Sequence, residues 1–172
     1  MAGLLENKVV VISGVGPALG TTLARRCAEE GADLVLAART VERLEDVAKQ
    51  VTDLGRRALS VGTDITDEAQ VDNLVKETLD AYGKVDVLIN NAFKVPSMKP
   101  FANTSFDHIR ETVELTVLGA LRLIQGFTPP ALVEAKVGGE RQLDGAPAFR
   151  SQAGCLQAGQ GGAAVDVAVV GQ

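Results

Sequence analysis

The first 128 residues alternate short apolar runs with segments whose apolar residues recur three and four positions apart. Short runs rich in Val, Leu, Ile and Ala are typical of strands buried in a parallel sheet. The segments between them have the spacing of amphipathic helices. Four strand–helix repeats predict a doubly wound α/β fold with helices on both faces of a parallel sheet. We expect strands at 8–13, 32–38, 57–62 and 85–89, and helices at 21–30, from Thr40 to Gly55, from Thr66 to about Gly83, and from about Asn103 to Gly126.

Residues 137–172 have a different composition. They hold eight of the 18 glycines, contain no Ile, Tyr or Met, and show no helical period. We expect this Gly/Ala-rich tail to be poorly ordered or irregular, apart from one weak strand between Ala163 and Val170. Residues 1–136 then form one incomplete domain. Its fourth strand is expected to be an unpaired sheet edge beside an exposed apolar face of the long helix, which favours self-association.

Composition excludes several classes of function. The chain carries 22 acidic and 17 basic residues, a net charge of −5, which disfavours nucleic-acid binding. No apolar run has the length of a membrane span, and the start does not resemble a signal peptide, so we expect a cytoplasmic protein without a membrane partner. Two cysteines and one histidine are too few for a metal site, and we predict none.

A glycine-rich turn joins the first strand to the first helix. It runs Ser13-Gly14-Val15-Gly16-Pro17-Ala18-Leu19-Gly20. At such a position Gly14 allows a tight turn, Gly20 allows close helix–strand packing, and the helix N-terminus offers free N–H groups to a pyrophosphate. The alternative is a glycine-rich turn without a ligand. Matching features after the later strands weigh against that alternative.

Three motifs in this order resemble the short-chain dehydrogenase/reductase family. The family's Thr-Gly-x-x-x-Gly-x-Gly motif corresponds to Ser13, Gly14, Ala18 and Gly20, although Ala18 replaces the middle glycine and the neighbouring Pro17 is unusual. The resemblance covers about residues 6 to 136.

The other two motifs follow the third and fourth strands. The family's adenine-contacting Asp corresponds to Asp64, which Ile65 follows. Its Asn-Asn-Ala-Gly motif corresponds to Asn90, Asn91 and Ala92, with Phe93 in place of the glycine, and this departure narrows the space beside the cofactor ribose.

The resemblance implies a Rossmann-like sheet with strand order 3-2-1-4, here truncated after the fourth strand and the long helix. It also implies an NAD(P) cofactor and hydride transfer to or from a small carbonyl or alcohol. The residues expected at the cofactor are Ser13, Gly14, Gly16, Pro17, Ala18, Leu19, Gly20, Arg39, Asp64, Ile65, Asn90, Asn91, Ala92 and Thr116.

The end of the second strand bears on which cofactor binds. An acid there would bind the ribose 2′-OH of NAD, but this chain has Ala38 followed by Arg39. The planar guanidinium of Arg39 can pair with the 2′-phosphate of NADP, so we expect NADP in preference to NAD. The alternative is an ordinary solvated arginine at a helix start.

The family's catalytic residues are missing from this chain. The family uses a Ser, a Tyr, a Lys four residues after the Tyr, and a supporting Asn, with the Tyr as general acid/base. The only tyrosine is Tyr82, followed four residues later by Asp86, and Thr116 occupies the place of the Asn. The single histidine, His108, is interpreted as a surface residue. We predict no catalytic residue here.

The tail suggests a reason for this loss. Read one base later, degenerate codons allow a Tyr at the codon of Leu156 and a Lys at that of Gln160, with a Ser thirteen positions before the Tyr. We hypothesise a change of reading frame between Glu134 and Val137, which the nucleotide sequence tests. Two interpretations remain open: an NAD(P)-dependent oxidoreductase by family, or a catalytically inactive dinucleotide-binding fragment.

Overall fold

Five strands form a single sheet in the order β3-β2-β1-β4-β5. The structure, a computed structural model, describes residues 3–95, 97–128 and 166–169. In chain order its elements are β1 (Val9–Ser13), α1 (Leu19–Glu29), β2 (Asp33–Ala38), α2 (Val41–Asp53), β3 (Ala58–Gly62), α3 (Glu68–Tyr82), β4 (Val87–Asn90), the 3₁₀ turn η1 (Phe101–Asn103), α4 (Phe106–Val113), the π-helical turn η2 (Glu114–Gly119), α5 (Ala120–Phe127) and β5 (Asp166–Val169).

The first four strands are parallel, and their order confirms the predicted 3-2-1-4 arrangement. β1 is central, with Ile12 opposite Leu36 of β2 on one side and Ile89 of β4 on the other. Parallel neighbours need crossover helices, which is why every strand in this part of the chain is followed by a helix. The Rossmann-like expectation is therefore correct.

The expectation that β4 forms an unpaired edge is wrong. β5 lies antiparallel beside it, with Val87 opposite Val169 and Asn90 opposite Asp166. This strand falls within the weak strand expected between Ala163 and Val170. The pairing supplies hydrogen-bonding partners to the outer side of β4, which the composition of the tail did not indicate.

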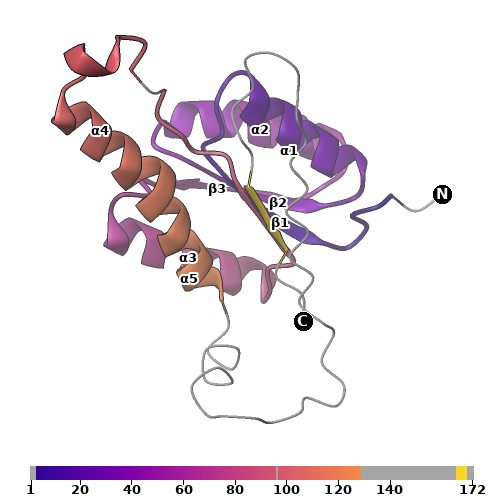
Figure 1. Cartoon of the computed structure of the whole chain (residues 1–172). Helices are drawn as coiled ribbons and strands as arrows, with labels where there is room; N and C mark the ends of the chain where they lie inside the picture. Colours follow the sequence, from indigo (N-terminus) through magenta and orange to yellow (C-terminus); the bar gives the residue numbers. More distant parts are fainter. Residues whose placement is uncertain (1–2, 96, 129–165, 170–172) are drawn as a thin grey trace, which may run out of the picture.

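Helices cover both faces of the sheet (Figure 1). Side chains on β1 alternate between the two faces, so Val10 and Ile12 pack in the core under α1 and α2, and Val9 and Val11 pack in the core under α3 and α5. All five residues of β1 are buried. Burial on both faces explains why this strand is a continuous apolar run.

The long helix differs from its predicted bounds. It begins at Phe106, because the Ser105 hydroxyl accepts the backbone N–H of His108 at 3.3 Å and caps the first turn. Asn103 lies instead in the short turn η1. The helix then continues through η2 to Phe127. A π-helical turn was not predicted, since it has no periodic sequence pattern.

The starts of α3 and α2 differ only in detail from the predicted helix starts. Asp67, not Thr66, caps α3, because its carboxylate accepts the N–H groups of Ala69 and Gln70 at 3.0 and 3.3 Å. Thr40 is the N-cap of α2 as expected, but its side chain makes no capping hydrogen bond. Both differences involve one or two residues and leave the order of elements unchanged.

Most of the tail lies outside the described residues. So do Leu156 and Gln160, whose codons could encode the Tyr and the Lys in the offset frame, and residues 134–137, where we hypothesise the frame change. Within the residues that the structure describes, no helix combines the length and the apolar character needed to cross a bilayer.

Side chains of Val113, Val117, Leu121 and Ile124 form an exposed apolar stripe along the long helix. The predicted self-association of this stripe stays a prediction.

Candidate functional site

The glycine turn lies at the edge where the parallel strands end. Gly14 has a φ of +70°, and a Cβ built on it would stand 2.4 Å from the Cα of Ala92, in the segment after β4. Only glycine fits this contact, because the positive φ disfavours any side chain and the backbone of Ala92 leaves no space for one. The turn after β1 and the segment after β4 therefore touch directly.

Two polar residues hold this contact in place. The carboxamide of Asn91 donates to the Gly14 carbonyl at 2.7 Å. The Ser13 hydroxyl accepts the N–H of Asn91 at 3.2 Å and that of Ala92 at 3.4 Å, and donates to Ile89. Ser13 is fully buried, so its role in the structure is to shape the loop. The side chain of Asn90 is also buried, and it has no hydrogen-bond partner among the described residues.

The N-terminus of α1 is open. Its N-cap residue, Ala18, offers no side-chain hydrogen bond, and the first turn holds no acidic residue. A Cβ on Gly20 would stand 2.7 Å from the Cα of Val15, so the helix packs directly on the loop, whereas a Cβ on Gly16 would meet only the Gly14 carbonyl at 3.9 Å. The N–H of Thr21 donates to the Gly16 carbonyl at 3.1 Å, which among the described residues leaves the N–H groups of Leu19 and Gly20 free to bind an anion such as a pyrophosphate.

Arg39 and Asp64 lie at the same edge, after β2 and β3. The guanidinium of Arg39 is exposed, and its charge acts on the carboxylate of Asp64. Burial alone would raise the pKa of Asp64, but hydrogen bonds from Thr66 and the charge of Arg39 lower it overall. The carboxylate accepts the N–H of Thr66 at 2.9 Å and its hydroxyl at 2.7 Å, which fixes a tight turn. Ile65, within this turn, is buried.

Thr116 has a contact that the sequence did not predict. It is exposed on η2, and its hydroxyl accepts the backbone N–H of Lys94 at 3.4 Å. The ammonium of Lys94 also pairs with Glu111 on α4. These two contacts join the segment after β4 to the long helix. Sequence reasoning missed Lys94 because its partners lie 17 and 22 residues away and no motif links them.

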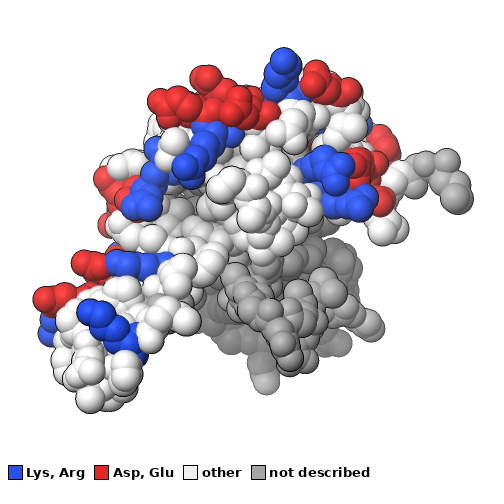
Figure 2. Space-filling view, turned by 90° about the horizontal axis from the view of Figure 1, so that it is seen from above, with Lys and Arg blue, Asp and Glu red and all other residues white. Residues whose placement is uncertain are grey.

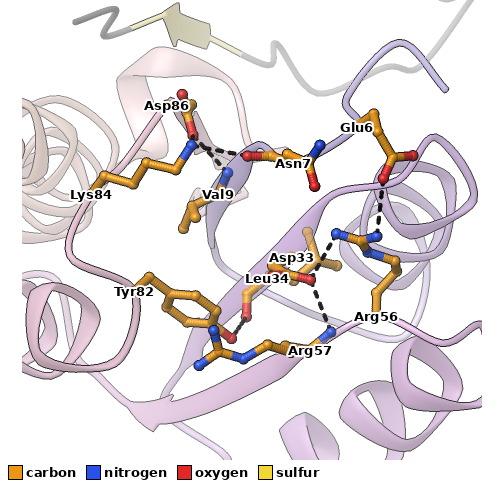
Figure 3. A network of polar contacts seen from close by, with 10 residues as sticks. All are labelled: Glu6, Asn7, Val9, Asp33, Leu34, Arg56, Arg57, Tyr82, Lys84 and Asp86. Atoms are coloured by element: carbon orange, nitrogen blue, oxygen red, sulfur yellow. Dashed lines mark hydrogen bonds and ion pairs between the residues drawn. The ribbon is translucent and has the colours of Figure 1, made fainter. Parts of the chain in front are cut away.

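The chain's only tyrosine lies at the opposite edge of the sheet (Figure 3). The Tyr82 hydroxyl donates to the Leu34 carbonyl at 3.2 Å, near the start of β2, and the Arg57 guanidinium sits 4.4 Å from the ring centroid. Burial raises the pKa of Tyr82, although the charge of Arg57 opposes this. The phenol therefore stays protonated at neutral pH and has a structural role here.

Asp86, four residues after Tyr82, belongs to the same edge (Figure 3). Its carboxylate accepts the N–H of Val9 at 2.9 Å and pairs with Lys8 at 3.1 Å and Lys84 at 2.8 Å. Burial alone would raise the pKa of Asp86, but these donors lower it overall. Asp86 thus anchors the start of β1.

The interpretation of His108 as a surface residue is only partly right. His108 lies in the first turns of α4 and is half-buried, and its buried Nε2 has no hydrogen-bond partner in the described part of the chain. Basic and acidic side chains are interspersed on the face seen in Figure 2. Among residues 3–95, 97–128 and 166–169, no three His, Cys, Asp or Glu side chains gather into a group that could hold a metal ion.

Comparisons with known proteins agree with this geometry. A fatty acyl-CoA reductase of Acinetobacter baylyi is 34% identical over 128 residues, which are 73% of this chain and 43% of that protein. Among solved structures, an NAD⁺-bound xylitol dehydrogenase matches with a TM-score of 0.71 and 27% identity, over 76% of this chain and 50% of that one. The L-sorbose reductase of Gluconobacter frateurii, complexed with NADPH and L-sorbose, matches with a TM-score of 0.68 and 33% identity, over 74% and 48%.

The chain thus spans about half the length of these relatives. The sequence model of the family described as short chain dehydrogenase matches residues 8–139, more than half of this chain. These residues include the glycine turn, Asp64 and the Asn90–Asn91 pair. The chain belongs to the short-chain dehydrogenase family.

Proposed function

We propose that this chain binds an adenine dinucleotide along the edge where β1 to β4 end, and that it prefers NADP to NAD. The observation that carries the proposal is the glycine turn, which contacts Asn91 and Ala92 in the segment after β4 and lies beside the open N-terminus of α1. In parallel α/β sheets, this edge is where nucleotides bind.

Each part of the site has a separate task. The N–H groups at the start of α1 hydrogen-bond the pyrophosphate, and Gly16 leaves room for it. Arg39 pairs with the 2′-phosphate of NADP, and the Asp64 turn lies at the adenosine end of the site. The dinucleotide, when bound, supplies or accepts the hydride of the oxidoreductase reaction. The family relation supports a small carbonyl or alcohol as the substrate of the whole enzyme.

We also propose that this chain by itself does not transfer hydride. Carbonyl reduction needs a proton donor at the developing alkoxide, and losing such a group costs about 10²–10⁴ in rate. The chain's only tyrosine donates to the Leu34 carbonyl at the opposite edge, and Asp86 anchors Val9. The alternative is that the chain acts as an oxidoreductase, which its family membership favours. Turnover of NADPH with a panel of aldehydes and ketones separates the two, because a rate well above the no-enzyme rate would contradict our proposal.

The cofactor preference is tested by Arg39→Ala. A charge-assisted hydrogen bond to a phosphate contributes about 1.5–3 kcal/mol, so NADP⁺ should bind roughly 10 to 100 times more weakly to the variant. NAD⁺ has no 2′-phosphate, and its dissociation constant should change little. Calorimetric titration of the full chain measures both constants. Arg26→Ala, in the last turn of α1, is a matched control that should change neither. Equal losses for the two cofactors would show that Arg39 does not bind the 2′-phosphate.

A further inference from the structure

The π-helical turn η2 contacts two loops at the carboxyl edge of the sheet. Near its middle, the Thr116 hydroxyl accepts the N–H of Lys94, which follows β4. At its end, Gly119 packs against Ile65, which follows β3. Turns of this kind interrupt α-helices at a cost and are frequent at functional sites. One turn of the long helix thus reaches loops at both ends of the proposed nucleotide site.

The contact between Gly119 and Ile65 leaves no room for a side chain. A Cβ on Gly119 would stand 2.7 Å from both Cγ1 and Cδ1 of Ile65, and 3.2 Å from its backbone carbonyl oxygen. Ile65 is 5% exposed and belongs to the core beneath the helix, so its side chain has little space to rotate away. An added methyl group would therefore push on the backbone of Ile65 as well as on its side chain.

Movement of Ile65 would disturb the turn that orients Asp64. Asp64 and Thr66 flank Ile65 in the chain. The carboxylate of Asp64 accepts both the backbone N–H and the hydroxyl of Thr66. The backbone N–H of Asp64 donates to Gln70 at 2.9 Å. These bonds set the direction of the Asp64 backbone and carboxylate, and they depend on the position of the residue between them.

We infer that Gly119 is a positioning residue for the adenosine end of the nucleotide site, because it lets the long helix rest directly on Ile65 and so fixes the Asp64 turn. This inference rests on the proposed dinucleotide binding. It concerns a glycine that belongs to none of the three motifs after the first, third and fourth strands. The specific expectation is that Gly119 controls the affinity for the adenosine half of the cofactor.

The test uses Gly119→Ala in the full chain, with Gly126→Ala as the matched control. Gly126 lies on the same helix, and a Cβ there would meet side-chain methyl groups of α3, Val75 Cγ2 at 3.0 Å and Val71 Cγ1 at 3.7 Å, but not Ile65. Both variants replace a helical glycine with alanine, which has the higher helix propensity. Overpacking against Ile65 should weaken the binding of adenosine 2′,5′-bisphosphate about tenfold in Gly119→Ala, which is about 1.4 kcal/mol. Gly126→Ala should bind this ligand like the wild type.

A second variant tests the mechanism. Ile65→Val removes the δ-methyl group, one of the two atoms nearest to the added Cβ, so combining it with Gly119→Ala should recover part of the lost affinity. Hydrogen exchange at the Thr66 amide, which reports on the Asp64 turn, should be faster in Gly119→Ala than in Gly126→Ala.

Unchanged affinity and unchanged Thr66 exchange in Gly119→Ala would overturn the inference, even if its melting temperature fell. A fall in affinity of the same size in Gly126→Ala would overturn it too, because the effect would then not depend on Ile65. If the wild type bound no adenine nucleotide, the proposed function would fail, and the role of Gly119 at a nucleotide site would fall with it. The exchange of Thr66 would still show separately whether Gly119 holds the Asp64 turn.

Discussion

The two edges of this sheet differ in how their polar residues are used. At the edge where the strands begin, charged side chains pair with one another: Arg56 contacts Glu6 at 3.4 Å and Asp33 at 3.1 Å. At the edge where the strands end, Ser13 and Asn91 are hydrogen-bonded to backbone groups, and the backbone itself shapes the site. Figure 3 shows the contacts of the first network.

This difference shows which residues are available for chemistry. A side chain whose hydrogen bonds are already made inside the fold contributes stability, as Tyr82 and Asp86 do. The helix N-terminus of α1, in contrast, has N–H groups that its N-cap residue does not satisfy. Residue type alone does not distinguish the two edges, since both contain acids and arginines.

The largest effect that separates the edges is expected for Gly14→Ala. The variant combines a left-handed backbone, φ +70°, with a Cβ 2.4 Å from the Cα of Ala92, so we expect about 2–5 kcal/mol of destabilisation. Nucleotide binding should be lost as well. Gly55→Ala is the control, because Gly55 has a φ of +78° but nothing within 4 Å, and only the backbone cost of about 1–2 kcal/mol applies. Urea unfolding of both variants measures the difference. Equal losses would contradict the close contact at Ala92.

A smaller effect, confined to the opposite edge, is expected for Asp86→Asn. The amide keeps an acceptor for Val9 but loses both lysine pairs, so stability at pH 7 should fall by about 1–2 kcal/mol while nucleotide affinity is unchanged. The pKa of Asp86 is lower in the folded chain than its ordinary value of 3.8, so its contribution to stability is complete above that value.

The stability of the wild type and of Asp86→Asn should therefore converge as the pH falls below 3.8 and through the folded pKa. Unfolding free energies measured between pH 7 and pH 3 give this comparison. A difference between the two proteins that stayed constant over the whole range would exclude the ionised carboxylate as its source.

The smallest effect is expected for Tyr82→Phe. The variant loses the hydrogen bond to the Leu34 carbonyl but keeps the ring beside Arg57, so we expect a loss of about 0.5–1.5 kcal/mol. Thermal unfolding measures it, and Tyr82→Ala, which also removes the ring, should cost more. The affinity for NADP⁺ should not change in either variant. A marked change would place Tyr82 near the nucleotide and break the distinction between the edges.

The sequence by itself determined four parallel strands and the position of the glycine turn, whereas the strand order was an implication of the family resemblance. These features depend on local patterns: β-branched apolar runs such as Val9–Ser13, amphipathic helices, and glycines at fixed places after a strand. Its errors at Thr66 and Asn103 were local, because competing cap residues lie only one or two positions away. The sequence also showed that no Tyr-x-x-x-Lys is present.

Only the tertiary structure decided what depends on contacts between distant segments. It placed Tyr82 at the edge opposite the glycine turn, paired β4 with β5, and brought Lys94 to Thr116 and Gly119 to Ile65. No periodicity encodes such contacts, because they follow from the packing of whole elements on the sheet. The π-helical turn depends in the same way on how one helix meets two loops.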